Sequence, residues 1–100
     1  QMASNVDLKF EWDDDKAAAN LRKHKVSFDE AKTVFADPSS ITIKDASHSD
    51  DEYRFVDIGV SVNGRILVVV YTERASSTRL ISSRQATKAE RYKYEERKEL

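Results

Sequence analysis

Three apolar stretches separated by short turns, between residues 53 and 84, place the narrowest limits on how this chain can fold. They read YRFVDIGVSV, RILVVVYTER and STRLISSR, and the first alternates with the two-residue period of a strand that has one buried face. Asn63-Gly64 joins the first two stretches, and this pair tolerates the positive φ of a type I′ turn. The middle stretch is apolar on both faces, as in a central strand. The sequence therefore predicts an antiparallel meander.

Helix signals lie on both sides of the meander. Asp13 is the expected N-cap of a first helix, which reads DDKAAANLRKHK after the cap. Ser27 opens a second helix with a capping-box pattern, and Pro38 stops it. Thr87 opens a last helix with the same pattern, and that helix is expected to run to about Arg97.

Two shorter segments, LKFEW at residues 8–12 and SITIKD at residues 40–45, alternate as strands do. The expected order is βααββββα, an α+β fold whose antiparallel sheet is packed by the N-terminal helices and a C-terminal helix. Three aromatic residues are predicted to belong to the core: Trp12, Phe28 and Phe35. A length of 100 residues indicates one domain over residues 1–100, with residues 1–7 expected as a disordered N-terminus or as residues added for expression.

Composition excludes several classes of protein. The chain has no cysteine, so it has no disulfide framework and no Cys-ligated metal site. Its longest apolar run, residues 66–71, is too short to span a membrane, and the N-terminus lacks the apolar core of a secretory signal. We therefore expect a cytoplasmic protein without membrane contacts.

An acidic loop resembles a possible cation site. Its candidate ligands are Asp45, His48, Asp50, Asp51 and Glu52. Their spacing fits no EF-hand pattern, so a solvated acidic loop is the favoured interpretation. No metal and no cofactor is expected.

Charge is distributed unevenly along the chain. Residues 74–100 carry eight Lys and Arg against four Asp and Glu, a net of +4. Residues 1–73 carry nine against fourteen, a net of −5, so the overall −1 conceals a basic segment. Strand ends and the last helix contribute its cations, namely Arg74, Arg79, Arg84, Lys88 and Arg91. Such a surface suits nucleic-acid phosphates. The alternative is a solvated helix whose bases pair locally with its own glutamates.

Three blocks of sequence resemble the BrnT toxin family of bacterial toxin–antitoxin systems. They read FEWDDDKAAANLRKHKVSFDEAKTVFADP, GRILVVVYTER and RLISSRQATKAERYKYE, in family order over residues 10–95. Lys25 stands where the family has Gly after Lys-His, so the exit of the first helix is expected to differ in shape. Ser83 replaces a small Ala before Arg84.

This resemblance implies a RelE-like ribonuclease fold and an endoribonuclease, similar to mRNA interferases, that stops translation. It also implies a partner, an antitoxin of the ribbon-helix-helix type resembling BrnA. The two proteins would together repress their own promoter, so DNA would be contacted only through the complex.

Metal-free RNA cleavage requires deprotonation of the 2′-OH, stabilisation of the phosphorane and protonation of the leaving 5′-oxygen. Arginines suit the second task, His24 could act as acid or base with electrostatic help from Lys23, and Tyr94 or Glu73 could transfer or position a proton. The candidate catalytic residues are therefore Lys23, His24, Glu73, Arg74, Arg79, Arg84 and Tyr94. The candidates for binding both RNA and the antitoxin are Arg79, Arg84, Lys88 and Arg91.

Each acid–base candidate also has a structural interpretation. His24 could cap the dipole of the first helix or fill the edge of the core, Glu73 could pair with Arg74, and Tyr94 could simply pack. Two other functions stay open from the residues alone. One is a non-catalytic nucleic-acid- or protein-binding module, and the other is an inert interaction domain whose uneven charge serves solubility.

Overall fold

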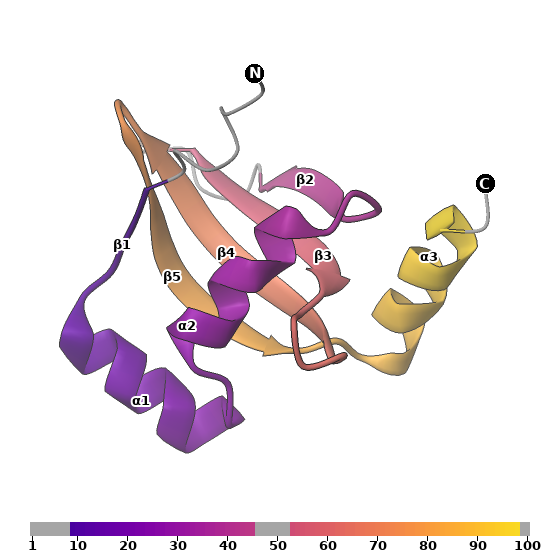
Figure 1. Cartoon of the computed structure of the whole chain (residues 1–100), viewed down its shortest axis with the longest axis horizontal. Helices are drawn as coiled ribbons and strands as arrows, with labels where there is room; N and C mark the ends of the chain where they lie inside the picture. Colours follow the sequence, from indigo (N-terminus) through magenta and orange to yellow (C-terminus); the bar gives the residue numbers. More distant parts are fainter. Residues whose placement is uncertain (1–8, 46–52, 99–100) are drawn as a thin grey trace.

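The computed structural model describes residues 9–45 and 53–98, which form an α+β fold around a five-stranded sheet (Figure 1). In chain order the elements are β1 (Phe10–Glu11), α1 (Asp14–His24), α2 (Phe28–Ala31), the 3-10 helix η2 (Lys32–Ala36), β2 (Ile41–Asp45), β3 (Arg54–Val60), β4 (Ile66–Arg74), β5 (Ser77–Gln85) and α3 (Lys88–Lys98). The predicted α+β class is confirmed. Residues 1–7 and residues 46–52 of the acidic loop lie outside the described residues.

The sheet has the strand order β1-β5-β4-β3-β2. The meander from β2 to β5 is antiparallel, as predicted. The expectation of a wholly antiparallel sheet is wrong, because β1 pairs in parallel with β5. Parallel neighbours need a long crossover connection, and here the helices and three strands lie between the two paired segments. The first strand of the chain therefore lies beside the last.

The hairpin between β3 and β4 lies where Asn63-Gly64 predicted it, but its turn is of another type. Gly64 has a φ of +81°, whereas Asn63 has a negative φ. The Gly64 N–H donates to the Ser61 carbonyl at 2.9 Å, and the Ser61 N–H donates to the Arg65 carbonyl at 2.8 Å. This is a three-residue loop in which one glycine takes the left-handed position, not a type I′ turn.

A β-bulge interrupts the pairing of β4 with β5. The register shifts between Val70 and Tyr71, which leaves Ile81 as an extra residue on β5. Arg79 and Arg84 are five residues apart, a spacing that would place them on opposite faces of a regular strand. Their partners on β4 are four residues apart and share a face. The bulge therefore brings both arginines to one side of the sheet.

One side of the sheet, called here the covered face, carries Leu67, Val69, Tyr71 and Leu80. α1, α2 and η2 lie against it (Figure 1), and Phe28 is buried there. Trp12 and Phe35 are partly buried and pack on the same cluster, so the predicted aromatic core is confirmed. η2 approaches β3 so closely that a Cβ at Gly59 would lie 2.9 Å from the Val34 Cγ1 atom.

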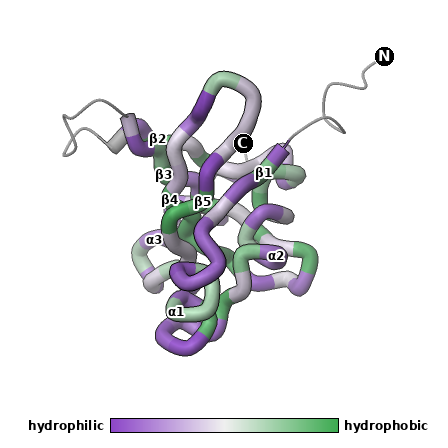
Figure 2. Tube along the Cα trace, turned by 90° about the vertical axis from the view of Figure 1, so that its left-hand side faces the viewer, coloured by the Kyte–Doolittle hydropathy of each residue, from purple (hydrophilic) through white to green (hydrophobic). Residues whose placement is uncertain are grey.

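The other side, called here the open face, carries Val56 of β3, Val70 of β4 and both Arg79 and Arg84 of β5. Figure 2 shows α2 and α3 on opposite sides of the strands. α3 packs on one end of the open face through a small cluster of Ile58, Val68, Ala86 and Tyr94. Among the described residues, no helix is long and apolar enough to cross a membrane.

The ends of the helices follow the local sequence. The predicted N-caps Asp13, Ser27 and Thr87 are confirmed, since each side-chain oxygen accepts a hydrogen bond from the backbone N–H three residues on, at 3.0–3.2 Å. Lys25, directly after α1, has φ 61° and ψ 32°, and its N–H donates to the Leu21 carbonyl at 2.9 Å. A lysine thus adopts the left-handed conformation for which helix ends favour glycine.

Candidate nucleic-acid interface

Two arginines and one glutamate meet at the edge of the open face. Glu11 is opposite Arg79 in the parallel β1–β5 register. The Glu11 Oε2 atom lies 3.4 Å from the Arg74 Nε atom and 3.6 Å from the Arg79 Nη1 atom. All three side chains remain between 34% and 45% exposed. One carboxylate therefore lies between two guanidinium groups that solvent can reach.

Arg84 is held by a carboxylate from α3. Its Nη1 and Nη2 atoms donate to the two carboxylate oxygens of Glu90 at 2.8 and 2.9 Å. The hydrogen bonds from Arg84 lower the pKa of Glu90 to about 2, against the effect of burial and with help from the Thr87 N–H. This fork-to-fork geometry is the one with which a guanidinium binds phosphate, and it ties α3 to β5.

A row of polar side chains crosses the open face near the turn between β4 and β5. Glu11, Arg79, Thr72 and Arg54 are successive partners in the register of β1, β5, β4 and β3. Directly opposed residues project to the same face. Thr72 is 2% exposed, and in the described part of the chain its Oγ1 atom has no hydrogen-bond partner. A buried hydroxyl without a partner costs about 1–3 kcal/mol, so it calls for a group that completes it.

A groove of about 630 Å³ lies on the same face, between the strands and α3. Val56, Val70 and Ile43 contribute its apolar lining. Arg84 and Lys93 bring positive charge to it. The open face thus combines an apolar floor with cations at its rim.

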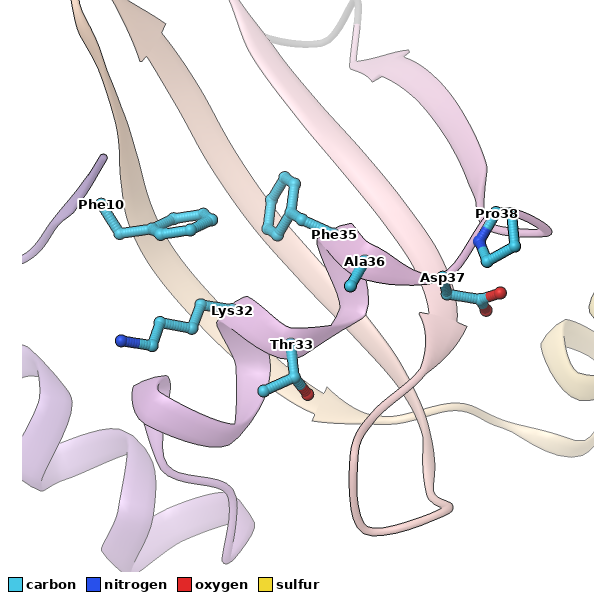
Figure 3. Close-up of a pocket in the computed structure, with 7 residues that line it drawn as sticks. All are labelled: Phe10, Lys32, Thr33, Phe35, Ala36, Asp37 and Pro38. Carbon is cyan, nitrogen blue, oxygen red and sulfur yellow. The ribbon is translucent and has the colours of Figure 1, made fainter. Parts of the chain in front are cut away.

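A second hollow, of about 540 Å³, follows η2 (Figure 3). The rings of Phe10 and Phe35 line it, with centroids 5.1 Å apart, and Lys32 stands at its side. Its one carboxylate, Asp37, already accepts hydrogen bonds from the Tyr94 hydroxyl at 2.6 Å and the Val60 N–H at 2.9 Å. With no arginine in its lining, this hollow suits phosphate less well than the open face does.

Two predicted acid–base residues, His24 and Lys23, belong to a helix that packs on the covered face. His24 and Lys23 end α1, whose Asn20 side chain donates to the Ser83 carbonyl at 2.8 Å and accepts from the Ser83 N–H at 3.1 Å on the covered face.

Glu73 and Tyr94, the other two proton-transfer candidates, are also poorly placed, for different reasons. Glu73 alternates with Thr72, so it belongs to the covered side of β4. Tyr94 is 2% exposed, and burial together with its hydrogen bond to Asp37 raises its pKa to about 12. The structure therefore gathers Arg74, Arg79 and Arg84 on one face but leaves the proton-transfer candidates elsewhere.

The two remaining cations of the predicted binding surface belong to the first turns of α3. Lys88 and Arg91 are exposed, and the Arg91 guanidinium donates to the Ala86 carbonyl at 3.3 Å. Both are open to a partner.

Sequence reasoning missed Glu11, Thr72 and Arg54. Counting outward from the β3–β4 turn pairs Arg54 with Thr72, so their proximity could have been found. Nothing local indicates that β1 pairs with β5, and Glu11 therefore gave no signal. Across the described ranges, no group of three or more His, Asp or Glu side chains is arranged to hold a metal ion.

The chain resembles a known protein family and a solved structure. The family described as ribonuclease toxin, BrnT, of type II toxin–antitoxin system matches residues 12–90. The 1.1 Å crystal structure of the Brucella abortus ribonuclease toxin BrnT is similar to this fold, with a TM-score of 0.63 and 24% sequence identity over 81% of this chain and 99% of that one. No curated protein gives a significant match. Because the family match spans more than half of its length, the chain belongs to the BrnT family of ribonuclease toxins of type II toxin–antitoxin systems.

Proposed function

We propose that this toxin is an endoribonuclease that cleaves RNA by metal-independent attack of a ribose 2′-OH on the adjacent phosphate and so inhibits translation, as mRNA interferases do. The observation that carries the proposal is the placement of Arg74, Arg79 and Arg84 on one accessible face. Guanidinium groups bind phosphate oxygens in pairs and stabilise the charge that develops on a phosphorane. They can supply the stabilisation that a metal ion gives in other nucleases.

The proposal rests on the arginines, because none of the four acid–base candidates is accessible on the arginines' face of the sheet, where the proton would have to be transferred. His24 and Lys23 are the last residues of α1, which lies on the covered face, Glu73 belongs to that side of β4, and Tyr94 is buried. These four stay candidates on chemical grounds. Their positions support them less than the positions of the arginines support phosphate binding.

We further propose that the fold is RelE-like and that the partner is a ribbon-helix-helix antitoxin of the BrnA type. Membership of the family implies an antitoxin and an RNA substrate, and the element order supports the fold. The antitoxin would cover the cations that hold RNA, namely Arg79, Arg84, Lys88 and Arg91. The toxin would reach DNA only through this complex, which would repress its own operon.

The test is digestion of total RNA by the purified protein, with and without EDTA, followed by analysis of the new ends. We expect cleavage to persist in EDTA and to leave 2′,3′-cyclic phosphate and 5′-hydroxyl ends. A preparation of the Arg79→Ala/Arg84→Ala double variant, purified identically, controls for contaminating nucleases. Ends with a 5′-phosphate, or loss of activity on chelation, would overturn the mechanism. RNA binding without any cleavage would point instead to a non-catalytic binding module.

A further inference from the structure

We infer that Glu11 is the general base of the cleavage reaction and that the row from Glu11 to Thr72 is its phosphodiester site. This inference rests on the proposed ribonuclease function. A base must lie within reach of the 2′-OH while the neighbouring phosphate is held. Glu11 is the carboxylate that the structure places between two phosphate-binding groups on the open face, with Arg79 and Arg74 both within 3.6 Å.

The position of Glu11 is fixed by the backbone of two strands. Thr78 donates its N–H to the Lys9 carbonyl at 2.8 Å, and the parallel register sets Glu11 against Arg79. The charged groups recorded against its carboxylate, within the described ranges, are Arg79 from β5 and Arg74 from the end of β4. Both are cations, so the carboxylate lies where a phosphate held by the same two arginines would bring a ribose hydroxyl close to it.

Other carboxylates near the arginines are less suited to this task. Both carboxylate oxygens of Glu90 accept hydrogen bonds from Arg84, and one of them also accepts from the Thr87 N–H at 2.8 Å. Glu73 belongs to the covered side of β4. The Glu11 ion pairs are longer, at 3.4 and 3.6 Å, and its side chain is 40% exposed, so a ribose hydroxyl can reach it.

Thr72 gives a second, independent indication. Its hydroxyl is buried next to Arg79 in the register and, within the described residues, lacks a partner. A non-bridging phosphate oxygen held by Arg79 would accept a hydrogen bond from this hydroxyl. The substrate would then satisfy a polar group that the free protein leaves unsatisfied.

The step balances as a transesterification. The Glu11 carboxylate takes the proton of the 2′-OH, and the 2′-oxygen forms a bond to phosphorus. Arg74 and Arg79 hydrogen-bond the phosphate oxygens as charge develops there. The bond from phosphorus to the 5′-oxygen breaks, that oxygen takes a proton from water, and Glu11 returns its own proton to solvent.

The experiment compares wild-type protein with Glu11→Gln on a defined single-stranded RNA and on its 2′-O-methylated counterpart, which cannot be cleaved. The amide keeps the size of the side chain and removes its basicity. We expect the rate to fall by about 10²–10⁴-fold, with binding of the methylated RNA equal to or tighter than that of the wild type, since a negative charge has left the arginines. The rise in rate with pH on the acidic side of the wild-type profile should disappear. Glu96→Gln, which removes an exposed carboxylate from α3, is the control and should leave rate and profile unchanged.

Each other outcome contradicts the inference in its own way. A Glu11→Gln variant that keeps the wild-type rate and profile shows that another group is the base, while the ribonuclease function stands. A variant that loses rate only in proportion to lost RNA binding shows that Glu11 positions the arginines and does not transfer the proton. If the wild-type protein itself leaves RNA intact, the ribonuclease proposal and the role of Glu11 both fall.

Discussion

The two faces of the sheet differ in what closes them. Three helical elements cover one face, where Leu67 and Val69 are fully buried. The Phe35 and Tyr71 rings pack in the same cluster with their centroids 4.8 Å apart. The open face is closed at one end by α3, which buries Tyr94 as its single large side chain. Its other end presents ion-paired arginines that remain accessible. The stability of the fold is thus concentrated on one side and its chemistry on the other.

This division explains how so small a domain can hold several cations close together. A folded domain of this size has a free energy of unfolding of about 5–15 kcal/mol, and mutual repulsion of cations lowers it. Here most apolar contacts are made on the opposite side of the same strands, so the charged side need not contribute much to the free energy of unfolding. Substitutions on the two faces should therefore separate stability from activity.

The largest effect is expected on the covered face. Leu67→Ala removes a side chain with no exposed area from the main cluster, and the free energy of unfolding should fall by about 2–5 kcal/mol. The activity of the remaining folded protein should be unchanged. Urea unfolding and RNA cleavage measured on the same samples test this. Val70→Ala, on the same strand but facing the open side, should cost less; equal losses for the two variants would contradict the division between faces.

The next largest effect is expected on the open face, where substitutions should lower activity more than stability. Arg79→Ala and Arg84→Ala should each slow RNA cleavage by about 10²–10³-fold, because each removes a group that stabilises charge in the transition state. Antitoxin binding should weaken as well, and the differences from wild type should shrink as salt screens exposed charges. Thermal unfolding should hardly change for Arg79→Ala, whereas Arg84→Ala also removes the pair with Glu90 and should lower the free energy of unfolding by up to about 1 kcal/mol. Arg22→Ala, an exposed cation on α1, is the matched control. Unchanged antitoxin affinity in both open-face variants would mean that RNA and antitoxin use separate surfaces.

The smallest effect is expected in how the stability of the fold changes at acidic pH. The pKa of Glu90 falls from its ordinary 4.5 to about 2, so its contribution to stability is complete above about pH 4.5 and is lost as the pH falls through 2. Asp57 on the covered face behaves oppositely: burial raises its pKa, against hydrogen bonds from Thr42 and Tyr71, and protonation relieves the penalty.

Urea unfolding of Glu90→Gln and Asp57→Asn between pH 7 and pH 2 measures both contributions. Glu90→Gln should lose less than about 1 kcal/mol at pH 7, since its pair is partly exposed, and should weaken less steeply in acid. Asp57→Asn should be at least as stable as wild type at pH 7. Parallel pH curves for all three proteins would refute the contrast.

Features that depend on neighbouring residues were predictable from the sequence. The caps at Asp13, Ser27 and Thr87 and the hairpin near Gly64 follow from side chains a few positions apart. The Arg79 and Arg84 candidates were also found, but their convergence was not explained. It depends on the bulge at Ile81, whose single extra residue leaves no recognisable pattern in STRLISSR.

Features that depend on distant parts of the chain could not be predicted. The parallel pairing of β1 brings Glu11 to the arginines, and no periodicity indicates which edge a two-residue strand will join. His24 carried the expected chemistry, yet side-chain chemistry does not determine the face on which a helix packs. The Asn20 contacts with the Ser83 backbone, which hold α1 on the covered face, join residues 63 positions apart.

The pairing of the first strand with the last also bears on when the toxin becomes dangerous to the cell that makes it. During synthesis the segment containing Glu11 emerges before its partner around Arg79, so the two cannot meet until β5 has been made. Contacts between such distant residues also form late and slowly during folding. A chain cut short by premature termination before β5 lacks this pairing altogether, and is therefore expected to be harmless. Only a polypeptide that already contains β5 has to find its antitoxin.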